Sequence, residues 1–377
     1  MRNFTSGRSS APRPLLETTN PIQEDRYSSQ RAILYVLLKS TIAIVLSLFA
    51  WEIIVRNTIE QSPGTTKHSI LGRIYNPGDR IESGEGFSRT RMNSLGMRND
   101  EILPKAQGEF RVLSIGDSFT SAEQVEDAKT YSARIGSTFK QQNSPVTVIN
   151  GGRTGATPAY YLHLADFYKT QLQPDAVIVQ INDSDFTEEG LDSTKEFYIR
   201  AQGNTFQAIH NQDFASDDRL SQLFQQKFPQ LSFMLQISTL RVGGKNLQAM
   251  LKKQAKPTEA APTKSQGNYD RLIEWTVVNL KAKYPNLVIL HIPYVTFNNP
   301  NEPPNPAEAA LIEIAEKHKV PIVAMRRDFV NYHQTFHQPT SGFNNSVPGT
   351  GHINEIGHEL IAQRLVPLLE AMRKKTN

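Results

Sequence analysis

The chain has 377 residues, of which 38% are hydrophobic and 21% are charged, so it is long enough to enclose a sizeable core. Its 41 basic and 37 acidic residues leave a net charge of +4 with no basic tract interleaved with aromatic residues, and nothing indicates a nucleic-acid partner. The absence of cysteine excludes thiolate nucleophiles, disulfides and cysteine-ligated metal sites.

An apolar run over residues 32–55 predicts a single membrane-spanning helix. It is interrupted only by Lys39 and Glu52, whose side chains are expected to reach toward opposite membrane faces. At about 1.5 Å per residue the run covers roughly the 30 Å hydrocarbon core. A buried amphipathic helix or a cleaved signal peptide fits less well, because the run is longer than a signal-peptide core and no small-residue cleavage site follows it.

Positive charge gathers on the amino-terminal side of this run. The basic residues before it are Arg2, Arg8, Arg13, Arg26 and Arg31. The positive-inside rule therefore predicts a cytoplasmic polar tail over residues 1–31 and places the rest of the chain outside the cytoplasm. Residues 56–109 are polar and rich in Gly, Ser and Pro, and we interpret them as a stalk and lead-in to a folded domain over residues 110–377.

Within that domain short apolar runs alternate with helical patterns. Strands are predicted at residues 110–115, 146–150, 175–181, 286–292 and 320–325, and helices at 130–142, 157–172, 269–284, 305–320 and 354–374, the last with a possible kink at Pro367. Largely apolar strands that alternate with helices indicate an α/β fold with a parallel five-stranded sheet covered on both faces. An insertion over about 183–268 interrupts the alternation and is far longer than a usual connection.

Four residues follow the carboxyl ends of these strands, where an open parallel sheet gathers its functional groups. Ser118 follows the first strand in "SIGDSF", Gly155 the second in "VINGGRTGAT" and Asn182 the third in "VIVQINDSDF"; His352 lies beyond the fifth in "GTGHINEIGH". We interpret Ser118 as a candidate nucleophile and His352 as the base that takes its proton. The backbone N–H groups of Ser118 and Gly155 and the Asn182 amide would supply oxyanion donors.

These blocks, in this order, resemble the SGNH (GDSL-type) hydrolase family, and the lead-in "NSLGMRNDE" resembles its membrane-anchored bacterial branch. The resemblance implies a flavodoxin-like three-layer α/β/α sandwich. It implies Ser118 and His352 as catalytic residues, with Ser118, Gly155 and Asn182 forming the oxyanion hole. It implies no cofactor and no metal.

The last block departs from the family pattern. The family reads Asp-x-x-His there, but this chain has Gly349 in place of the aspartate that orients the histidine. Loss of that carboxylate can cost on the order of ten thousand fold in turnover. A backbone carbonyl, Asp328 or Glu355 is an alternative orienting group. The first block also lacks the glycines that often occur around Ala122 and Gln124, which is expected to reshape the pocket.

Other polar residues have simpler interpretations. Asp117 and Asp183 are expected to stabilise turns beside the proposed donors, and His358 is expected to be structural. The "DSD" at 183–185 lacks the further ligands of a calcium loop.

The sequence therefore predicts a serine-dependent esterase or O-acyltransferase, membrane-anchored through 32–55, that acts outside the cytoplasm on ester-linked acyl groups, acetyl foremost, of an envelope carbohydrate or lipid. The alternative is a non-catalytic scaffold that binds an acylated glycan or an envelope partner, because Gly349 replaces the usual carboxylate.

Overall fold

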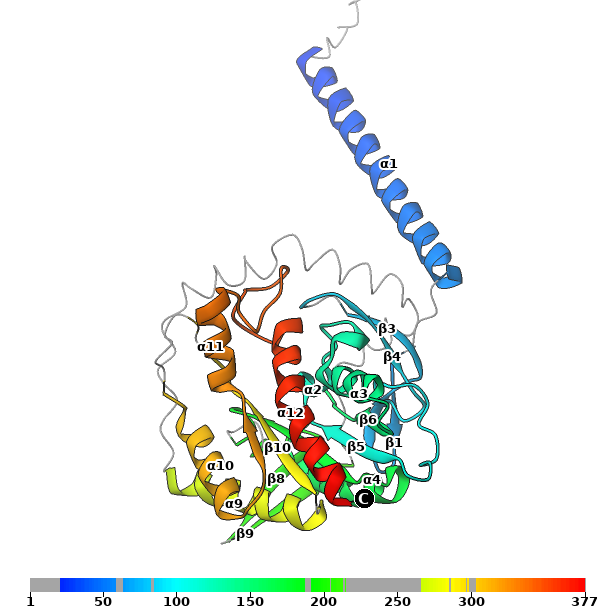
Figure 1. Cartoon of the computed structure of the whole chain (residues 1–377). Coiled ribbons are helices and arrows are strands. Elements are labelled where there is room, and N and C mark those ends of the chain that lie inside the picture. The colour runs from blue at the N-terminus through cyan, green and yellow to red at the C-terminus, as the bar shows by residue number, and fades with distance from the viewer. Residues whose placement is uncertain are drawn as a thin grey trace, which may run out of the picture. The chain divides into compact units, whose positions relative to one another are not determined.

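The computed structural model describes residues 21–58, 64–82, 85–186, 191–203, 205–212, 214, 266–284, 286–295, 297 and 303–376. The chain divides into two compact units, Met1–Val55 and Arg56–Asn377. In its described part the first unit is helix α1, which runs from Pro21 to Thr58 (Figure 1).

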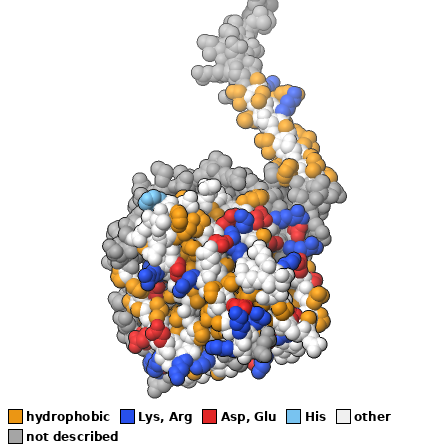
Figure 2. All heavy atoms as spheres, viewed as in Figure 1, with side chains coloured by type: hydrophobic (Ala, Val, Ile, Leu, Met, Phe, Trp, Pro, Cys, Tyr) orange, Lys and Arg blue, Asp and Glu red, His pale blue; other side chains and the backbone are white. Residues whose placement is uncertain are grey.

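Helix α1 contains one segment, Arg31–Ile54, that is long and apolar enough to cross a membrane. Most apolar side chains between residues 33 and 54 are exposed, as Figure 2 shows. The helix extends beyond both ends of the predicted span of 32–55, because backbone hydrogen bonding continues into the polar residues that flank an apolar run.

The second unit is built on a parallel five-stranded sheet with the order β11-β10-β7-β5-β6 (Figure 1). Its strands are β5 (Phe110–Ile115), β6 (Val146–Asn150), β7 (Ala176–Asn182), β10 (Leu287–Ile292) and β11 (Ile322–Ala324). All five predicted strands are present, and the α/β prediction is confirmed. The central strand β7 is buried at every position, as expected for a strand covered on both faces.

Helices cover both faces of the sheet and make it the middle of three layers. The first face packs on α4 (Pro158–Leu172), α9 (Gln266–Lys283) and α10 (Pro306–Lys317); the second packs on α3 (Tyr131–Gln141), α11 (Arg326–Phe336) and α12 (Glu355–Thr376). Within β5, Leu113 points to the first core and Val112 to the second, following the two-residue period of a strand. Helix α11 was not predicted, because Phe329 is its only fully buried residue; α12 continues through Pro367.

The segment interpreted as a stalk contains two antiparallel hairpins. They are β1 (Thr65–His68) with β2 (Gly72–Tyr75), and β3 (Gly78–Glu82) with β4 (Ser88–Met92). Leu71 and Met97 are buried in the core that also contains α4. The inward positions of β4 are Ser88, Thr90 and Met92, so two of three buried residues are polar. An alternation of apolar and polar residues, the usual strand signal, is therefore absent.

The predicted insertion is partly described. Strands β8 (Phe197–Gln202) and β9 (Thr205–His210) form a hairpin that packs on α4, with Phe197 and Ile199 buried. Residues 215–265 of the insertion lie outside the described residues.

Leu113→Ala tests the packing of the central sheet. Leu113 is fully buried, so the substitution leaves a cavity and is expected to lower the free energy of unfolding by about 2–5 kcal/mol. Urea unfolding of the full chain in detergent measures this. The matched control is Leu103→Ala at a side chain that is 73% exposed, and equal losses in the two variants would contradict the assignment of Leu113 to the core.

Candidate active site

The four predicted site residues meet at one pocket of about 260 Å³ at the carboxyl edge of the sheet. Ser118 begins the short helix α2 (Ser118–Ser121) after β5, and Asn182 ends β7. Gly155 follows β6, and His352 precedes α12. Parallel strands bring their carboxyl ends to one edge, which is why residues far apart in sequence line the same pocket.

A chain of hydrogen bonds joins Ser118 and His352 at this pocket to the side chain of Glu85. His352 Nε2 lies 2.8 Å from Ser118 Oγ, and His352 Nδ1 lies 2.6 Å from Glu85 Oε2. A carboxylate accepts hydrogen bonds, so the proton of a neutral imidazole lies on Nδ1. His352 Nε2 is then free to accept the Ser118 hydroxyl proton.

Glu85 was not among the predicted site residues. It stands between β3 and β4, in the segment interpreted as a stalk, with the local sequence "SGEGF". An acidic residue flanked by glycines at a hairpin tip was the available signal, but nothing in the sequence near Ser118 or His352 points to it. The pairing spans 267 residues and is decided by tertiary structure.

The position of Glu85 is held from several directions. Its Oε1 accepts a hydrogen bond from the His352 backbone N–H at 3.1 Å. The neighbouring Gly86 exchanges two hydrogen bonds with the Asn345 side chain, at 2.8 and 2.7 Å. Gly351 has a φ of +77°, and a Cβ there would lie 2.2 Å from Glu85 Oε1. A side chain at position 351 would therefore clash with the Glu85 carboxylate in its present position.

The groups that the sequence offered in place of the missing aspartate have other partners. Asp328 pairs with Arg364 at 3.6 Å, and Glu355 pairs with Lys129 at 3.1 Å. Gly349 has a φ of +83°, and a Cβ there would lie 3.2 Å from the Phe297 ring. The loop before His352 thus has a backbone that favours glycine at the family's aspartate position, and Glu85 supplies a carboxylate from elsewhere.

Two of the predicted oxyanion donors, Gly155 and Asn182, line the same pocket as Ser118. Asn182 Nδ2 donates to Asp117 Oδ2 at 2.5 Å, and Asn182 Oδ1 accepts from the Ser184 backbone N–H at 2.7 Å. The orientation of the amide is thus fixed. Asp117 also caps α2 by accepting from Phe119 N at 2.9 Å, as the turn-stabilising interpretation predicts. Gly155 has a φ of +74°, a backbone conformation that favours glycine, and no protein atom lies within 4 Å of its Cβ position.

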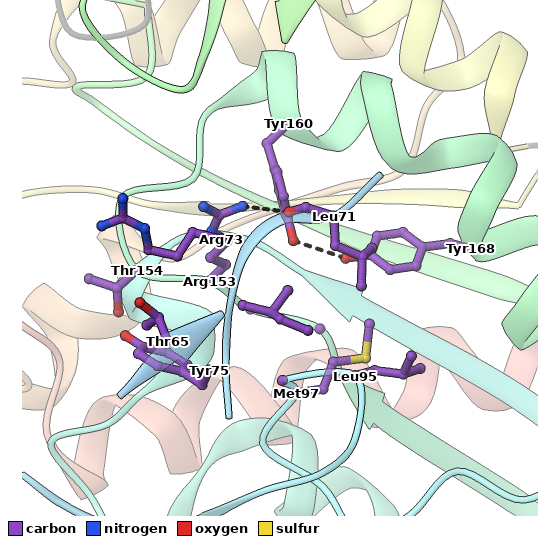
Figure 3. Close-up of a pocket in the computed structure, with 14 residues that line it drawn as sticks. Thr65, Leu71, Arg73, Tyr75, Leu95, Met97, Arg153, Thr154, Tyr160 and Tyr168 are labelled. Carbon is purple, nitrogen blue, oxygen red and sulfur yellow. Dashed lines mark hydrogen bonds between the residues drawn. The ribbon is translucent and has the colours of Figure 1, made fainter. Parts of the chain in front are cut away.

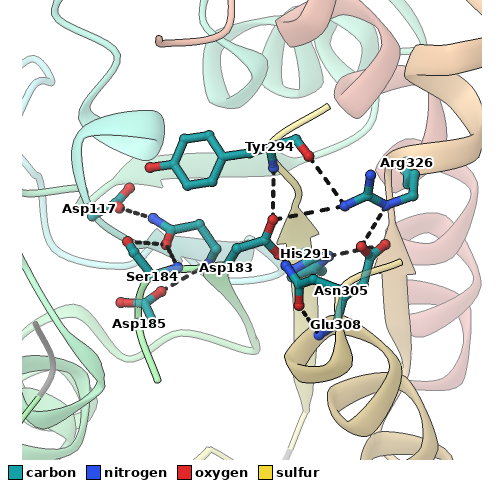
Figure 4. Close-up of polar contacts among 10 residues, drawn as sticks. Asp117, Asp183, Ser184, Asp185, His291, Tyr294, Asn305, Glu308 and Arg326 are labelled. Carbon is teal, nitrogen blue, oxygen red and sulfur yellow. Dashed lines mark hydrogen bonds and ion pairs between the residues drawn. The ribbon is translucent and has the colours of Figure 1, made fainter. Parts of the chain in front are cut away.

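Asp183, the residue that follows Asn182, belongs to a largely buried charge network, drawn in Figure 4. Asp183 Oδ1 lies 3.0 Å from His291 Nε2, and Asp183 Oδ2 accepts from the Tyr294 backbone N–H at 3.0 Å. Asp183 therefore links β7 to the segment after β10, a wider role than the predicted local turn. Although burial raises the pKa of Asp183, these hydrogen bonds and the charge of His291 lower it overall.

Arg326 completes this network. Its guanidinium pairs with Glu308 at 2.6 Å and with Asp183 at 3.8 Å. Asp183, His291 and Glu308 present potential ligand atoms within 4.8 Å of one another. Because Arg326 pairs with both carboxylates, the three groups are explained as parts of an ion network.

The lead-in before β5 braces the loops that carry the site residues. Arg98 donates to the backbone carbonyls of Ser121, Ala122 and Val125, just beyond Ser118. Ala122, where the family often has glycine, has a φ of +53° and is buried outside the pocket lining. Asn99 exchanges two hydrogen bonds with the Asn150 backbone at the end of β6. The lead-in is thus part of the structure around the pocket.

His358 lies outside this pocket, as the structural interpretation expects. Its ring is fully buried, and its Nδ1 accepts a hydrogen bond from Tyr131 N at 3.3 Å. Burial, together with the positive charges of Arg98 and Arg134, lowers the pKa of His358 to about 3.

The chain matches the model of the GDSL-like lipase/acylhydrolase family over residues 114–360 and belongs to that family. The protein is an ester hydrolase of the SGNH type. The family match begins after Glu85 and Arg98. No curated protein sequence matches this chain.

Solved structures similar to this chain include several esterases. One is a two-domain esterase active on acetylated mannans (15% identity, 71% of this chain, 51% of that chain, TM-score 0.37), of which this chain spans about half the length. Another is an acetylxylan esterase from Geobacillus stearothermophilus (14% identity, 70% of this chain, 95% of that chain, TM-score 0.38). A third is a psychrotrophic esterase from Pseudoalteromonas sp. (12% identity, 70% of this chain, 98% of that chain, TM-score 0.36).

Gly351→Ala tests the placement of Glu85. The added methyl group displaces the carboxylate from His352, and a displacement of about 1 Å is expected to lower kcat/KM for an ester by about 10²-fold or more. Gly203→Ala is the matched control, because Gly203 also has a positive φ, +56°, but has no atom within 4 Å of its Cβ position. Parent-like hydrolysis by Gly351→Ala of 4-nitrophenyl acetate would count against this geometry.

The buried His358 predicts an acid-sensitive contribution to stability. Its folded-state pKa lies below the unfolded value of about 6.5, so this contribution is complete above that pH and is lost as the pH falls toward 3. The slope is about 1.4 kcal/mol per pH unit for one proton. Urea unfolding between about pH 7 and pH 4 gives the free energy of unfolding as a function of pH. In His358→Gln its dependence on pH should be smaller by the uptake of one proton. An unchanged dependence would contradict the assignment.

Proposed function

We propose that Ser118, His352 and Glu85 act as a nucleophile, general base and orienting carboxylate in ester hydrolysis. The observation that carries the proposal is the unbroken chain of hydrogen bonds from Ser118 Oγ through His352 to Glu85. A serine hydroxyl becomes a useful nucleophile when a base takes its proton, and a carboxylate on the far nitrogen stabilises the imidazolium that forms.

The proposed reaction has two steps. Ser118 Oγ attacks the ester carbonyl carbon while His352 Nε2 takes its proton, and His352 returns that proton to the alcohol as the carbon–oxygen bond breaks. A water molecule then attacks the acyl-serine and gives a proton to His352, which passes it to Ser118 Oγ as the acyl–oxygen bond breaks and the acid is released. The negative charge on the carbonyl oxygen is stabilised by the Ser118 and Gly155 backbone N–H groups and by Asn182 Nδ2.

The proposed substrate carries a short ester-linked acyl group, acetyl foremost, on an envelope carbohydrate or lipid. The pocket, at about 260 Å³, falls below the roughly 300–1,000 Å³ of pockets for drug-sized ligands. Phe119 and Tyr294, whose ring centres lie 6.0 Å apart in an edge-to-face arrangement, form part of its wall. These features favour a short acyl chain over a long one.

We also propose that the domain after residue 55 works outside the cytoplasm, anchored through 32–55 with residues 1–31 as a cytoplasmic tail. The apolar helix and the basic residues before it support this arrangement. Transfer to a sugar hydroxyl instead of water uses the same acyl-serine, so O-acyl transfer stays within the proposal. Faster acyl transfer to a carbohydrate than to water would identify a transferase.

The non-catalytic alternative depended on the absence of a carboxylate at Gly349. Glu85 weakens that argument, because its carboxylate lies 2.6 Å from the His352 imidazole although position 349 carries no carboxylate. Asp at 349 would require a strained backbone beside Phe297. We therefore expect Gly349→Asp not to restore the activity of a Glu85 variant.

Glu85→Gln is the sharpest test of this mechanism. The amide keeps the shape of the side chain but no longer selects the Nδ1–H tautomer, so kcat for 4-nitrophenyl acetate is expected to fall by about 10⁴-fold. Ser118→Ala and His352→Ala should abolish labelling of the full chain by a serine-directed fluorophosphonate. Glu355→Gln, which removes a carboxylate paired with Lys129, is the matched control. Labelling that persists in Ser118→Ala would overturn the assignment of the nucleophile.

A further inference from the structure

A second pocket lies beside the candidate active site, shown in Figure 3. Its volume is about 120 Å³. One loop forms a wall of both pockets: residues 151–154 line the second pocket, and residues 155–157 line the first. The Cα atoms of Gly152 and Gly155 are therefore at most about 11 Å apart, since an extended chain spans about 3.6 Å per residue. One short oligosaccharide is long enough to reach both pockets.

The lining of this second pocket combines hydroxyl groups and aromatic rings with the apolar side chains of Leu71, Ile74, Leu95 and Met97. The hydroxyl-bearing residues are Thr65, Tyr75, Thr154, Tyr160 and Tyr168. Figure 3 shows the hydroxyl groups of Tyr160 and Tyr168 meeting each other, and their oxygens are 3.4 Å apart. Burial raises the pKa of Tyr168 well above its usual value, so its hydroxyl keeps its proton. Rings that carry hydroxyl groups match the mixed apolar and polar faces of a sugar.

Two arginines add positive charge to this lining. Arg153 donates from Nη1 to the Leu71 carbonyl at 2.9 Å and from Nη2 to Glu196 Oε2 at 2.5 Å, and its guanidinium lies 4.8 Å from the centre of the Tyr160 ring. Arg73 also lines the pocket, and its guanidinium faces the Phe214 ring at 5.7 Å. Among the described residues, the Arg73 guanidinium has no anionic partner.

The charge balance of this cluster is positive. One carboxylate is Glu196, which accepts from Arg153 and from the Arg73 backbone N–H at 3.0 Å. A second is Glu123, which accepts from Thr154 Oγ1 at 3.1 Å and pairs with Arg80 at 3.5 Å. Gly72 makes room for Glu196, because a Cβ there would lie 2.5 Å from Glu196 Oε1. Among the described residues, the guanidinium groups of Arg73, Arg80 and Arg153 against these two carboxylates leave one positive charge. A singly charged carboxylate matches that balance better than a phosphate group, which carries nearly two negative charges.

From these observations we propose that the second pocket binds a carboxylate-bearing sugar residue of the acylated substrate. The proposal rests on the ester chemistry proposed for Ser118 and names the class of carbohydrate that it serves: an acylated acidic polysaccharide. The acyl group occupies the pocket beside Ser118 while the carboxylate of the same or a neighbouring sugar contacts Arg73 and the tyrosine hydroxyl groups.

The test compares two forms of one polymer with the full chain in detergent. Acetylated polygalacturonate presents free carboxylates, and its methyl-esterified form presents the same acetyl groups without the charges. We expect the parent to deacetylate the free-carboxylate polymer with a kcat/KM at least about tenfold higher, mainly through a lower KM, because a hydrogen bond between charged groups is stronger than one between neutral groups. This preference should shrink as salt is added.

Arg73→Gln is expected to reduce the ratio of the two kcat/KM values to near one, and Arg73→Lys to retain part of it. The matched control is Arg91→Gln, which removes the same charge from an exposed position on β4 outside the pocket; it should keep the parent ratio. Equal rates on the two polymers in the parent, or an equal fall in Arg73→Gln and Arg91→Gln, would overturn the proposed subsite.

A binding measurement separates this inference from the proposed catalysis. In Ser118→Ala, oligogalacturonate without acetyl groups should bind with an affinity that Arg73→Gln weakens about tenfold, as measured by calorimetry. If 4-nitrophenyl acetate is hydrolysed but oligogalacturonate does not bind, the subsite is wrong and the ester chemistry stands. If oligogalacturonate binds but no ester is hydrolysed, the proposed catalysis fails and the subsite stands.

Discussion

The hydrogen bond between His352 Nδ1 and Glu85 Oε2 is the interaction on which the candidate site depends. A histidine ring that no acceptor holds can rotate and exchange its proton between its two nitrogens. The carboxylate, 2.6 Å away, selects one tautomer and points Nε2 at Ser118. Because Glu85 is far from His352 in sequence, this bond exists only while the hairpin tip and the loop before α12 are packed together.

The contacts around that bond show how the packing is secured. Asn345 and Gly86 exchange two hydrogen bonds, and Gly351 leaves the space that the carboxylate occupies. Beside Ser118, Asp117 connects the start of α2 to Asn182. A buried polar group without a partner is costly, so each of these side chains is restrained by the groups that satisfy it. Such restraint favours a site that is ordered before any substrate binds.

The working unit of the protein is larger than the segment that matches its family. The match covers residues 114–360, yet Glu85 and the bracing Arg98 precede it. The walls of the second pocket also include Arg73 and Tyr75, from the same early segment. Residues 64–109 therefore connect three features: the orientation of His352, the support of the loop after Ser118, and the proposed carbohydrate subsite.

The sequence by itself determined the α/β class, the five strands and the apolar helix, because apolar periodicity and run length are local properties. It also singled out Ser118, Gly155, Asn182 and His352, since parallel strands deliver their carboxyl ends to one edge. Only the tertiary structure decided that the hairpins are part of the domain, because two of the three buried side chains of β4 are polar. Likewise only the fold brought Glu85 to His352, since pairing across 267 residues depends on long-range packing and leaves no local pattern in the sequence.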